Sequence, residues 1–140
     1  MDTVLVYFSR GGNTRKIAEA IAEELDIIPI DVKKESPDIS NAELLIVGSG
    51  TYGDKPGKEI ISFLENLNPV TGKRAAFFST CAGDASKTFA TMKKIVNNKG
   101  YSLIDCFSCF GKFALIKRGH PTDEELNQAK EFAKKCRTPK

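Results

Sequence analysis

Segments with the apolar pattern of a buried strand alternate, along this chain of 140 residues, with segments that have the apolar period of a helix. Residues 4–8 and 44–48 are short continuous apolar runs, the pattern of parallel strands that are covered on both faces. Between them, residues 13–25 repeat apolar side chains at every third or fourth position, as one face of a helix does. This alternation predicts an α/β fold with an open parallel sheet and helices on both faces.

Three further strands continue the pattern. Residues 27–30 are apolar but contain Pro29, which cannot donate to a strand ladder, so we expect this strand at the sheet edge. Residues 75–78 form another buried run, and a fifth strand begins near Tyr101.

The remaining helices are indicated by their start signals and apolar spacing. Pro56 suits the first turn of a helix that extends to Leu67, and residues 89–96 carry a second apolar stripe. The pair Thr122 and Glu125 has the spacing of a capping box and predicts the start of a last helix. Residues 32–42 are short and polar, so the helix expected between the second and third strands is shortened or absent.

A glycine-rich segment follows the first strand and leads directly into the first helix. Such a turn leaves several backbone N–H groups in one concavity, and the helix N-terminus adds its positive dipole end. The segment therefore predicts a phosphate-binding loop, although a polar turn capped by Asn13 or Thr14 would use the same residues. Neither the dinucleotide motif GxGxxG nor the motif GxxxxGK[ST] is present. The loop residues are Ser9, Arg10, Gly11, Gly12, Asn13 and Thr14.

Length and charge set limits on the class of protein. The chain is long enough for one domain, which we expect to cover residues 1–140. A net charge of +3, from 21 basic and 18 acidic residues that are mixed along the chain, argues against nucleic acid as a partner. No apolar run approaches the roughly 20 residues of a membrane span, and the first strand leaves no room for a signal peptide, so we expect a cytoplasmic protein.

The four cysteines predict reduced structural thiols. Cys106 and Cys109 lie in an expected strand, where residues three apart point to opposite faces, so this pair is not expected to chelate a metal. His120, the single histidine, has no nucleophile or carboxylate motif beside it and stays unassigned. No metal site and no catalytic residue are therefore predicted.

The pattern Ser-x-x-Gly-Asn-Thr at residues 9–14 resembles the phosphate loop of the flavodoxin family, and the resemblance extends from Thr3 to about Cys136. It implies a doubly wound sheet of five parallel strands in the order 2-1-3-4-5, with FMN at the carboxyl ends of the strands. A second loop resembles the flavodoxin segment in which an aromatic ring covers the flavin and a Gly-Asp peptide faces its N5 atom. The resemblance gives that loop as Gly50, Thr51, Tyr52, Gly53 and Asp54, with Tyr52 as the covering ring.

A third loop resembles the family only in outline. The segment that would surround the pyrimidine end of the flavin consists of Thr80, Cys81, Ala82, Gly83, Asp84 and Lys87. It is one residue longer between Cys81 and Gly83, and Lys87 stands where many flavodoxins have a stacking tyrosine. The second face of the flavin then stays exposed, or Phe89 or Phe113 covers it, or the pocket binds flavin weakly.

The charge near these loops differs from that of acidic flavodoxins. Lys55, Lys58 and Lys87 lie in or beside the expected flavin loops. We expect them to favour the negatively charged reduced flavin and a redox partner with an acidic docking face.

The resemblance implies an FMN-binding protein that carries single electrons between redox partners. Two alternatives stay open: a small FMN-dependent NAD(P)H:quinone-type reductase, and a flavodoxin-like module without flavin. A reductase needs a second wall for its site, for which 140 residues leave little chain.

Overall fold

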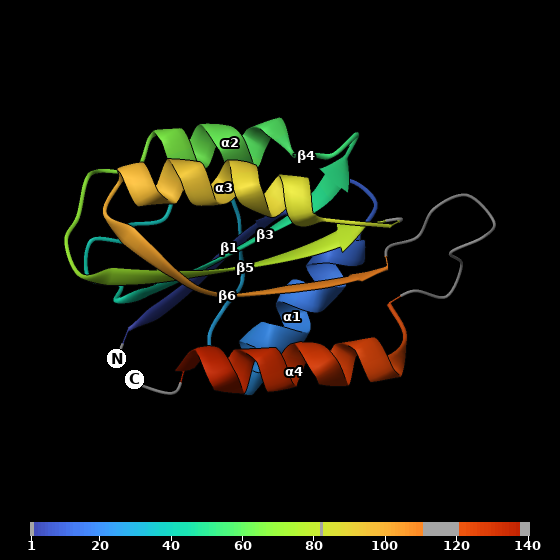
Figure 1. Ribbon diagram of the computed structural model, residues 1–140. Coiled ribbons are helices and arrows are strands. Elements are labelled where there is room, and N and C mark those ends of the chain that lie inside the picture. Colours follow the sequence, from blue (N-terminus) through green and yellow to red (C-terminus); the bar gives the residue numbers. More distant parts are fainter. Residues whose placement is uncertain (1, 82, 111–120, 138–140) are drawn as a thin grey trace.

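The computed structural model describes residues 2–81, 83–110 and 121–137 (Figure 1). Strands and helices alternate through these ranges as the sequence predicts. In chain order the elements are β1 (Thr3–Phe8), α1 (Asn13–Leu25), β2 (Ile30–Asp31), β3 (Leu44–Tyr52), β4 (Lys55–Pro56), α2 (Lys58–Glu65), β5 (Lys73–Cys81), α3 (Ser86–Asn98), β6 (Tyr101–Phe110) and α4 (Asp123–Arg137).

Five parallel strands form the sheet in the order β2-β1-β3-β5-β6, and the short β4 pairs antiparallel with β3. Without β4 this is the order 2-1-3-4-5, so the predicted topology is confirmed. Figure 1 shows α1 and α4 on one face of the sheet and α2 and α3 on the other. All five parallel strands point to the same edge, where the loops that follow β1, β3 and β5 meet.

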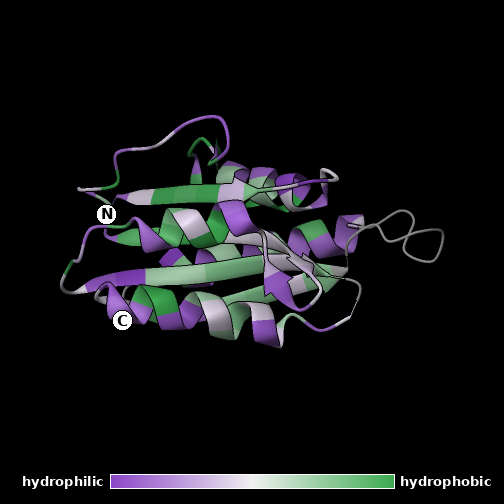
Figure 2. Ribbon diagram, turned by 90° about the horizontal axis from the view of Figure 1, so that it is seen from above, coloured by the Kyte–Doolittle hydropathy of each residue, from purple (hydrophilic) through white to green (hydrophobic). Residues whose placement is uncertain are grey.

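The sheet separates two apolar cores. Leu5, Ile46 and Phe78 face α1 and α4, whereas Val47 and Phe77 face α2 and α3. Neighbouring residues on one strand thus enter opposite cores, which explains why the central strands are continuous apolar runs. Figure 2 shows the consequence: the central strands are hydrophobic over their middle parts, and the helices alternate hydrophobic and hydrophilic positions.

Several predicted boundaries were wrong. The strand expected at residues 27–30 is the edge strand Ile30–Asp31, because Ile27 donates its N–H to Ala22 O in the cap of α1. The helix expected from Pro56 begins at Lys58 and ends at Glu65, because Pro56 lies in β4. Both central strands are also longer than their apolar runs, and their last residues are polar or small.

Residues 32–42 contain turns but no helix. The prediction that the helix between the second and third parallel strands is shortened or absent is therefore confirmed. Turns and irregular chain connect β2 to β3 instead.

The capping box at the start of α4 is confirmed in both directions. The Thr122 N–H donates to Glu125 Oε1 at 2.8 Å, and the Glu125 N–H donates to Thr122 Oγ1 at 3.2 Å. These two bonds satisfy N–H groups that have no partner within the helix.

All four cysteines are free thiols. Cys106 packs on the side of α2 and α3, whereas Cys109 is buried on the side of α1 and α4, so the predicted opposite orientation is confirmed. Burial raises the pKa of Cys106 to about 11 and the pKa values of Cys109 and Cys136 to about 12. These thiols are therefore protonated at neutral pH, and reactive thiolates are rare at them.

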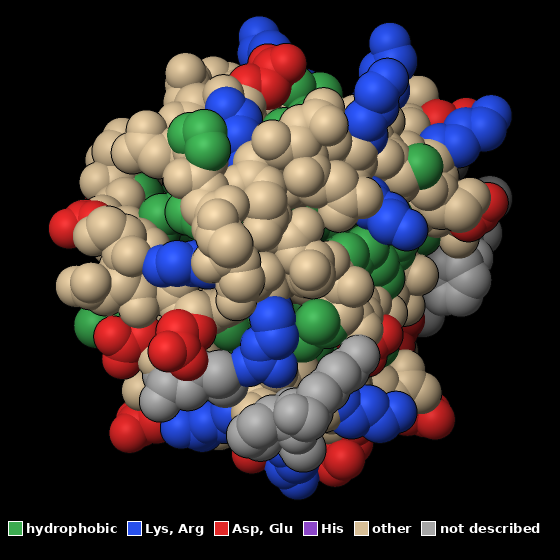
Figure 3. Space-filling view, turned by 60° about the vertical axis from the view of Figure 1, so that its left-hand side comes forward, with side chains coloured by type: hydrophobic (Ala, Val, Ile, Leu, Met, Phe, Trp, Pro, Cys, Tyr) green, Lys and Arg blue, Asp and Glu red, His purple; other side chains and the backbone are tan. Residues whose placement is uncertain are grey.

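The outer surface mixes charges of both signs. Figure 3 shows the side of the molecule toward the amino ends of the strands, where Lys and Arg side chains are interspersed with Asp and Glu. Among the described residues, no helix combines the length and hydropathy that crossing a membrane requires.

Gly48 gives a direct test of the central packing. It pairs with Phe78 across β3 and β5, and a Cβ atom at Gly48 would lie 2.0 Å from the Phe78 ring. We predict that Gly48→Ala lowers the free energy of unfolding by about 2 to 3 kcal/mol. Chemical denaturation of Gly48→Ala in the wild-type and Phe78→Leu backgrounds measures the effect. The cost should fall below about 1 kcal/mol in the smaller background, and equal costs in both would contradict the packing argument.

Candidate functional site

A cavity of about 500 Å³ opens at the carboxyl ends of β1, β3 and β5. Most of the residues predicted to bind the cofactor line it, and they come from all three predicted loops. The lining residues are Ser9, Gly11, Asn13, Thr14, Gly50, Thr51, Tyr52, Gly53, Asp54, Thr80, Cys81, Gly83 and Asp84.

Of the other predicted site residues that the structure describes, Arg10, Gly12 and Lys87 do not line the cavity wall. Arg10 and Gly12 belong to the first loop, and Lys87 lies in the first turn of α3. Ala82 lies outside the described residues. The expected loops were also too long, because Gly50, Thr51 and Tyr52 belong to β3 and Thr80 and Cys81 to β5.

The first loop is shaped by Ser9 and Gly12. The Gly12 N–H donates to Ser9 Oγ at 3.0 Å, and Gly12 has a φ of 89°, in the left-handed region that favours glycine. No atom lies within 4 Å of the Cβ positions of Gly11 or Gly12, so the loop surface is open there. The first turn of α1 has no acidic residue, so its positive dipole end is not neutralised by a local carboxylate.

Hydroxyl pairs connect the ends of the elements around the cavity. Thr14 Oγ1 and Thr80 Oγ1 lie 2.7 Å apart and join α1 to β5, and both side chains are buried. Thr51 Oγ1 and Ser79 Oγ lie 2.9 Å apart and join β3 to β5. Each hydroxyl supplies a partner to the other, which a buried polar group requires.

Ser49 makes two hydrogen bonds within the second loop, and the sequence analysis did not predict this role for it. Its hydroxyl donates to Gly50 O at 2.7 Å and accepts the Gly57 N–H at 2.9 Å, so it joins β3 to the start of α2. The sequence does carry a signal for such a role: a serine follows the apolar run of each of two neighbouring strands, Ser49 and Ser79.

The Gly53-Asp54 peptide forms the tip of a hairpin. Tyr52 pairs with Lys55, and both turn residues have positive φ, 59° at Gly53 and 67° at Asp54. Two such residues make the two-residue turn whose twist matches paired strands. Residues 53–54 were predicted to lie in a loop, and in the structure they form the two-residue turn between β3 and β4.

Lys87 reaches this hairpin. Its ammonium lies 3.7 Å from Asp54 Oδ2, and both side chains are mostly exposed. Lys87 is therefore part of an ion pair that bridges the second and third loops. An exposed pair of this kind contributes at most about 1 kcal/mol.

Tyr52 lies across the second loop toward the first. A Cβ atom at Gly50 would lie 2.5 Å from the Tyr52 hydroxyl, so only glycine leaves room for the ring. The Arg10 guanidinium lies 4.2 Å from the centre of the Tyr52 ring. Burial raises the pKa of Tyr52, and the backbone N–H and the charge of Arg10 oppose that rise. The sequence did not reveal this contact between the two loops.

The third loop places a thiol and a carboxylate at the cavity, and Ser86 donates hydrogen bonds to the carboxylate. Cys81 is buried, and its thiol donates to Gly83 O at 3.3 Å, while burial raises its pKa. Asp84 Oδ1 accepts the Ser86 N–H at 2.9 Å, which lowers the pKa of Asp84 and fixes the entry into α3. Cys81 therefore offers a neutral wall to the cavity, and Asp84 a negative rim.

Phe89 is held away from the cavity. Its ring stacks on Phe77 with centroids 6.4 Å apart, within the core beneath α3. The alternative in which Phe89 covers a flavin is not supported by this placement. Phe113, the other aromatic considered for that role, lies outside the described residues.

The chain belongs to the flavodoxin family. A family model described as a flavodoxin domain matches residues 4–116, which span the three loops and most of the sheet. A relative from Methanocaldococcus jannaschii, described as an uncharacterized protein, is 35% identical over 133 residues, covering 87% of this chain and 88% of its own length.

Solved structures share the fold. A flavodoxin from the domain Archaea superposes with a TM-score of 0.76 at 22% identity, covering 95% of this chain and 94% of its own. A flavodoxin from Agrobacterium tumefaciens, described as a WrbA-like protein, has a TM-score of 0.74 at 18% identity, covering 96% and 94%. At these identities the likeness is one of fold.

The Thr14–Thr80 pair predicts a thermodynamic coupling between α1 and β5. Thr14→Val leaves the buried Thr80 hydroxyl without a partner, so we expect it to lower the free energy of unfolding by about 1 to 3 kcal/mol. Thr14→Val together with Thr80→Val removes both hydroxyls and should cost less than the two single changes summed. Urea unfolding of the four proteins measures the coupling, and strict additivity would show that the hydroxyls do not interact.

Proposed function

We propose that the cavity binds FMN and that the protein carries single electrons between redox partners. The observation that carries this proposal is the meeting of three elements at one cavity: an open glycine loop at a helix N-terminus, a tyrosine ring, and the residues Thr80, Cys81, Gly83 and Asp84. This is the arrangement that the family uses for its cofactor. The cavity volume of about 500 Å³ is in the range of small-molecule and cofactor sites.

The first loop suits the phosphate group. Ser9, Asn13 and Thr14 line the cavity, and α1 begins at Asn13, which places the positive end of the helix dipole there. The open surface at Gly11 and Gly12 lets an anion approach the backbone closely. The hydroxyl of Thr14 is shared with Thr80, so a phosphate there would contact the first loop and the end of β5 together.

Tyr52 suits one face of the isoalloxazine ring. Arg10 now lies over the Tyr52 ring, and such a contact is worth about 0.5 to 1 kcal/mol at an exposed site. An aromatic ligand stacked on Tyr52 gains about as much beyond its area burial. Displacing the exposed Arg10 side chain therefore costs little, and its guanidinium would then be free to pair with the phosphate.

The third loop suits the pyrimidine end of the ring. Thr80, Cys81, Gly83 and Asp84 lie at the cavity wall, and burial raises the pKa of the Cys81 thiol there. The Lys87–Asp54 ion pair lies at the rim, and Lys87 stands where many flavodoxins have a stacking tyrosine. We infer that this hydrophilic pair borders the second face of the ring, which is therefore more open to water than a face covered by tyrosine.

Bound FMN would supply the acceptance and release of electrons. The chain itself would orient the ring, exclude water from its phosphate end and present a charged rim to partners. Lys55 and Lys58 are exposed and form no ion pair within the described residues, whereas Lys87 is paired. The two unpaired lysines would attract a redox partner with an acidic docking face. We propose that the two proteins meet in the cytoplasm.

A reductase is the second candidate, and the fold shared with the WrbA-like protein leaves it open. It differs from a carrier in needing a place for a nicotinamide donor beside the flavin. Steady-state oxidation of NADH and NADPH with a quinone acceptor distinguishes the two. We expect no turnover beyond the free-FMN background.

The phosphate assignment predicts a selective loss of affinity. Gly12→Val and Thr14→Val should each weaken FMN by about tenfold or more, and riboflavin by much less, because riboflavin lacks the phosphate. Quenching of flavin fluorescence on titration into apoprotein measures both ligands. Thr71→Val, an exposed threonine at the opposite end of the sheet, serves as the control. Equal losses for FMN and riboflavin would refute the assignment.

The charged rim predicts that salt slows the oxidation of the reduced protein by an anion. Reduced, FMN-loaded protein should be oxidised by ferricyanide at a rate that falls as salt rises, because the lysines attract the anion. Lys55→Gln and Lys58→Gln should slow this reaction and flatten its salt dependence, whereas Lys94→Gln on α3 should not. Stopped-flow absorbance measures the rates. A ferricyanide rate that rises with salt would overturn the proposed docking charge.

A further inference from the structure

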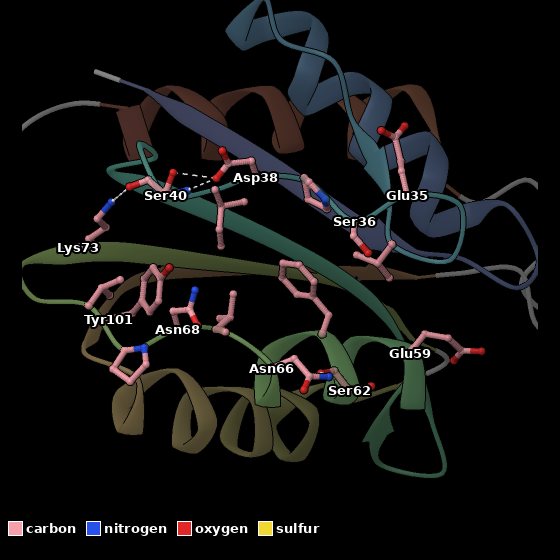
Figure 4. A pocket seen from close by; sticks show the side chains of 17 residues that line it. Glu35, Ser36, Asp38, Ser40, Glu59, Ser62, Asn66, Asn68, Lys73 and Tyr101 are labelled. Carbon is pink, nitrogen blue, oxygen red and sulfur yellow. Dashed lines mark hydrogen bonds between the residues drawn. The ribbon is translucent and has the colours of Figure 1, made fainter.

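A second cavity, of about 600 Å³, lies away from the three loops (Figure 4). It is bounded by the extended segment 32–40 on one side and by α2 with residues 66–70 on the other. The beginnings of β5 and β6 close one end. The cavity occupies the space beside α2 that a helix between β2 and β3 would have filled, so it follows directly from the missing helix.

The wall of this groove combines apolar and polar side chains. Val32, Ile39, Phe63, Leu67 and Val70 line it, and all five are also packed against or part of the core beneath α2 and α3. Burying such side chains under a ligand is worth about 25 cal/mol per Å² of apolar surface. A ligand with an apolar body therefore gains affinity from the groove.

Tyr101 gives the groove a polar end. The side chain is only 5% exposed, and its hydroxyl makes no hydrogen bond within the described part of the chain. Figure 4 shows this hydroxyl pointing into the cavity. Burial raises the pKa of Tyr101, so the hydroxyl carries its proton and can donate it. The hydroxyl is open to the cavity and can therefore donate a hydrogen bond to an oxygen of a ligand there.

Lys73 and Asn68 lie at the same end. The Lys73 ammonium donates to Ser40 O at 2.7 Å, which holds it at the mouth of the groove with two further N–H donors available. The Asn68 amide also points into the cavity (Figure 4). Three donor groups, one of them charged, thus lie at one end of the groove.

The acidic side chains of the lining are directed elsewhere. Asp38 Oδ1 accepts the N–H and the hydroxyl of Ser40, at 3.0 and 2.7 Å. Glu35 and Glu59 point away from the cavity in Figure 4. Lys73 is the one positively charged residue among the described residues of the lining, and Asp38 bonds the same Ser40 whose carbonyl accepts from Lys73.

We propose that this groove binds a small aromatic carboxylate, whose ring lies on Phe63 and Val70 and whose carboxylate accepts hydrogen bonds from Tyr101, Lys73 and Asn68. The size of the groove favours a small molecule over a helix of a partner protein. A helix about 10 Å across fills roughly 400 Å³ per turn, so the groove holds fewer than two turns. This binding does not depend on the flavin site.

Naphthalene-2-carboxylate is a suitable probe, with naphthalene-2-carboxamide as its uncharged match and 2-naphthylmethylamine as its cationic one. Isothermal titration calorimetry of the full chain, with and without saturating FMN, measures their dissociation constants. We expect the carboxylate to bind at least about tenfold more tightly than the other two, since charged hydrogen bonds are the stronger ones. FMN should leave its affinity unchanged.

Three variants assign the contacts. Tyr101→Phe and Lys73→Met should each weaken the carboxylate by about tenfold with the melting temperature unchanged, and Lys94→Met should have no effect. Asp38→Asn keeps the acceptor for the Ser40 N–H but removes the opposing charge, so it should tighten the carboxylate several-fold. The proposal is overturned if no probe binds at millimolar concentration, if the amine binds best, if FMN competes, or if Tyr101→Phe and Lys73→Met leave the affinity unchanged.

Discussion

The structure depends on the parallel register of three buried strands. Phe8 of β1 lies beside Ser49 of β3, and Gly50 of β3 lies beside Thr80 of β5. Because parallel strands in register end at the same edge, the three segments that follow them are forced together. The two cores on either side of the sheet fix this register, since a slip by one residue would exchange the apolar sets of Val47 and Phe78 between the faces.

Polar contacts then convert the common edge into a cavity. The Thr14–Thr80 and Thr51–Ser79 pairs close gaps between elements that the apolar cores do not reach. Ser49 ties the hairpin to α2, and the Lys87–Asp54 pair crosses the rim. The buried pairs hold the frame of the site, and the exposed pair is weak enough to open without cost to the fold.

The sequence predicted the parts of the molecule that follow from local pattern. The capping box at Thr122 and the missing helix at residues 32–42 were predicted because capping chemistry and apolar period are local signals, whereas the strand order came from the resemblance to the flavodoxin family. The β3–β4 hairpin was not, since Pro56 suits a first helical turn as well as a short strand. The contact of Arg10 with Tyr52 depends on two loops that meet only in the folded chain, so no spacing could indicate it.

We propose that the cavity at the ends of β1, β3 and β5 holds FMN. The most direct test is the absorption spectrum of the purified protein after equilibration with FMN and removal of free ligand. We expect one FMN per chain, with flavin fluorescence strongly quenched because the ring stacks on Tyr52. A colourless protein that retains no FMN, although folded by circular dichroism, would refute FMN binding at this cavity.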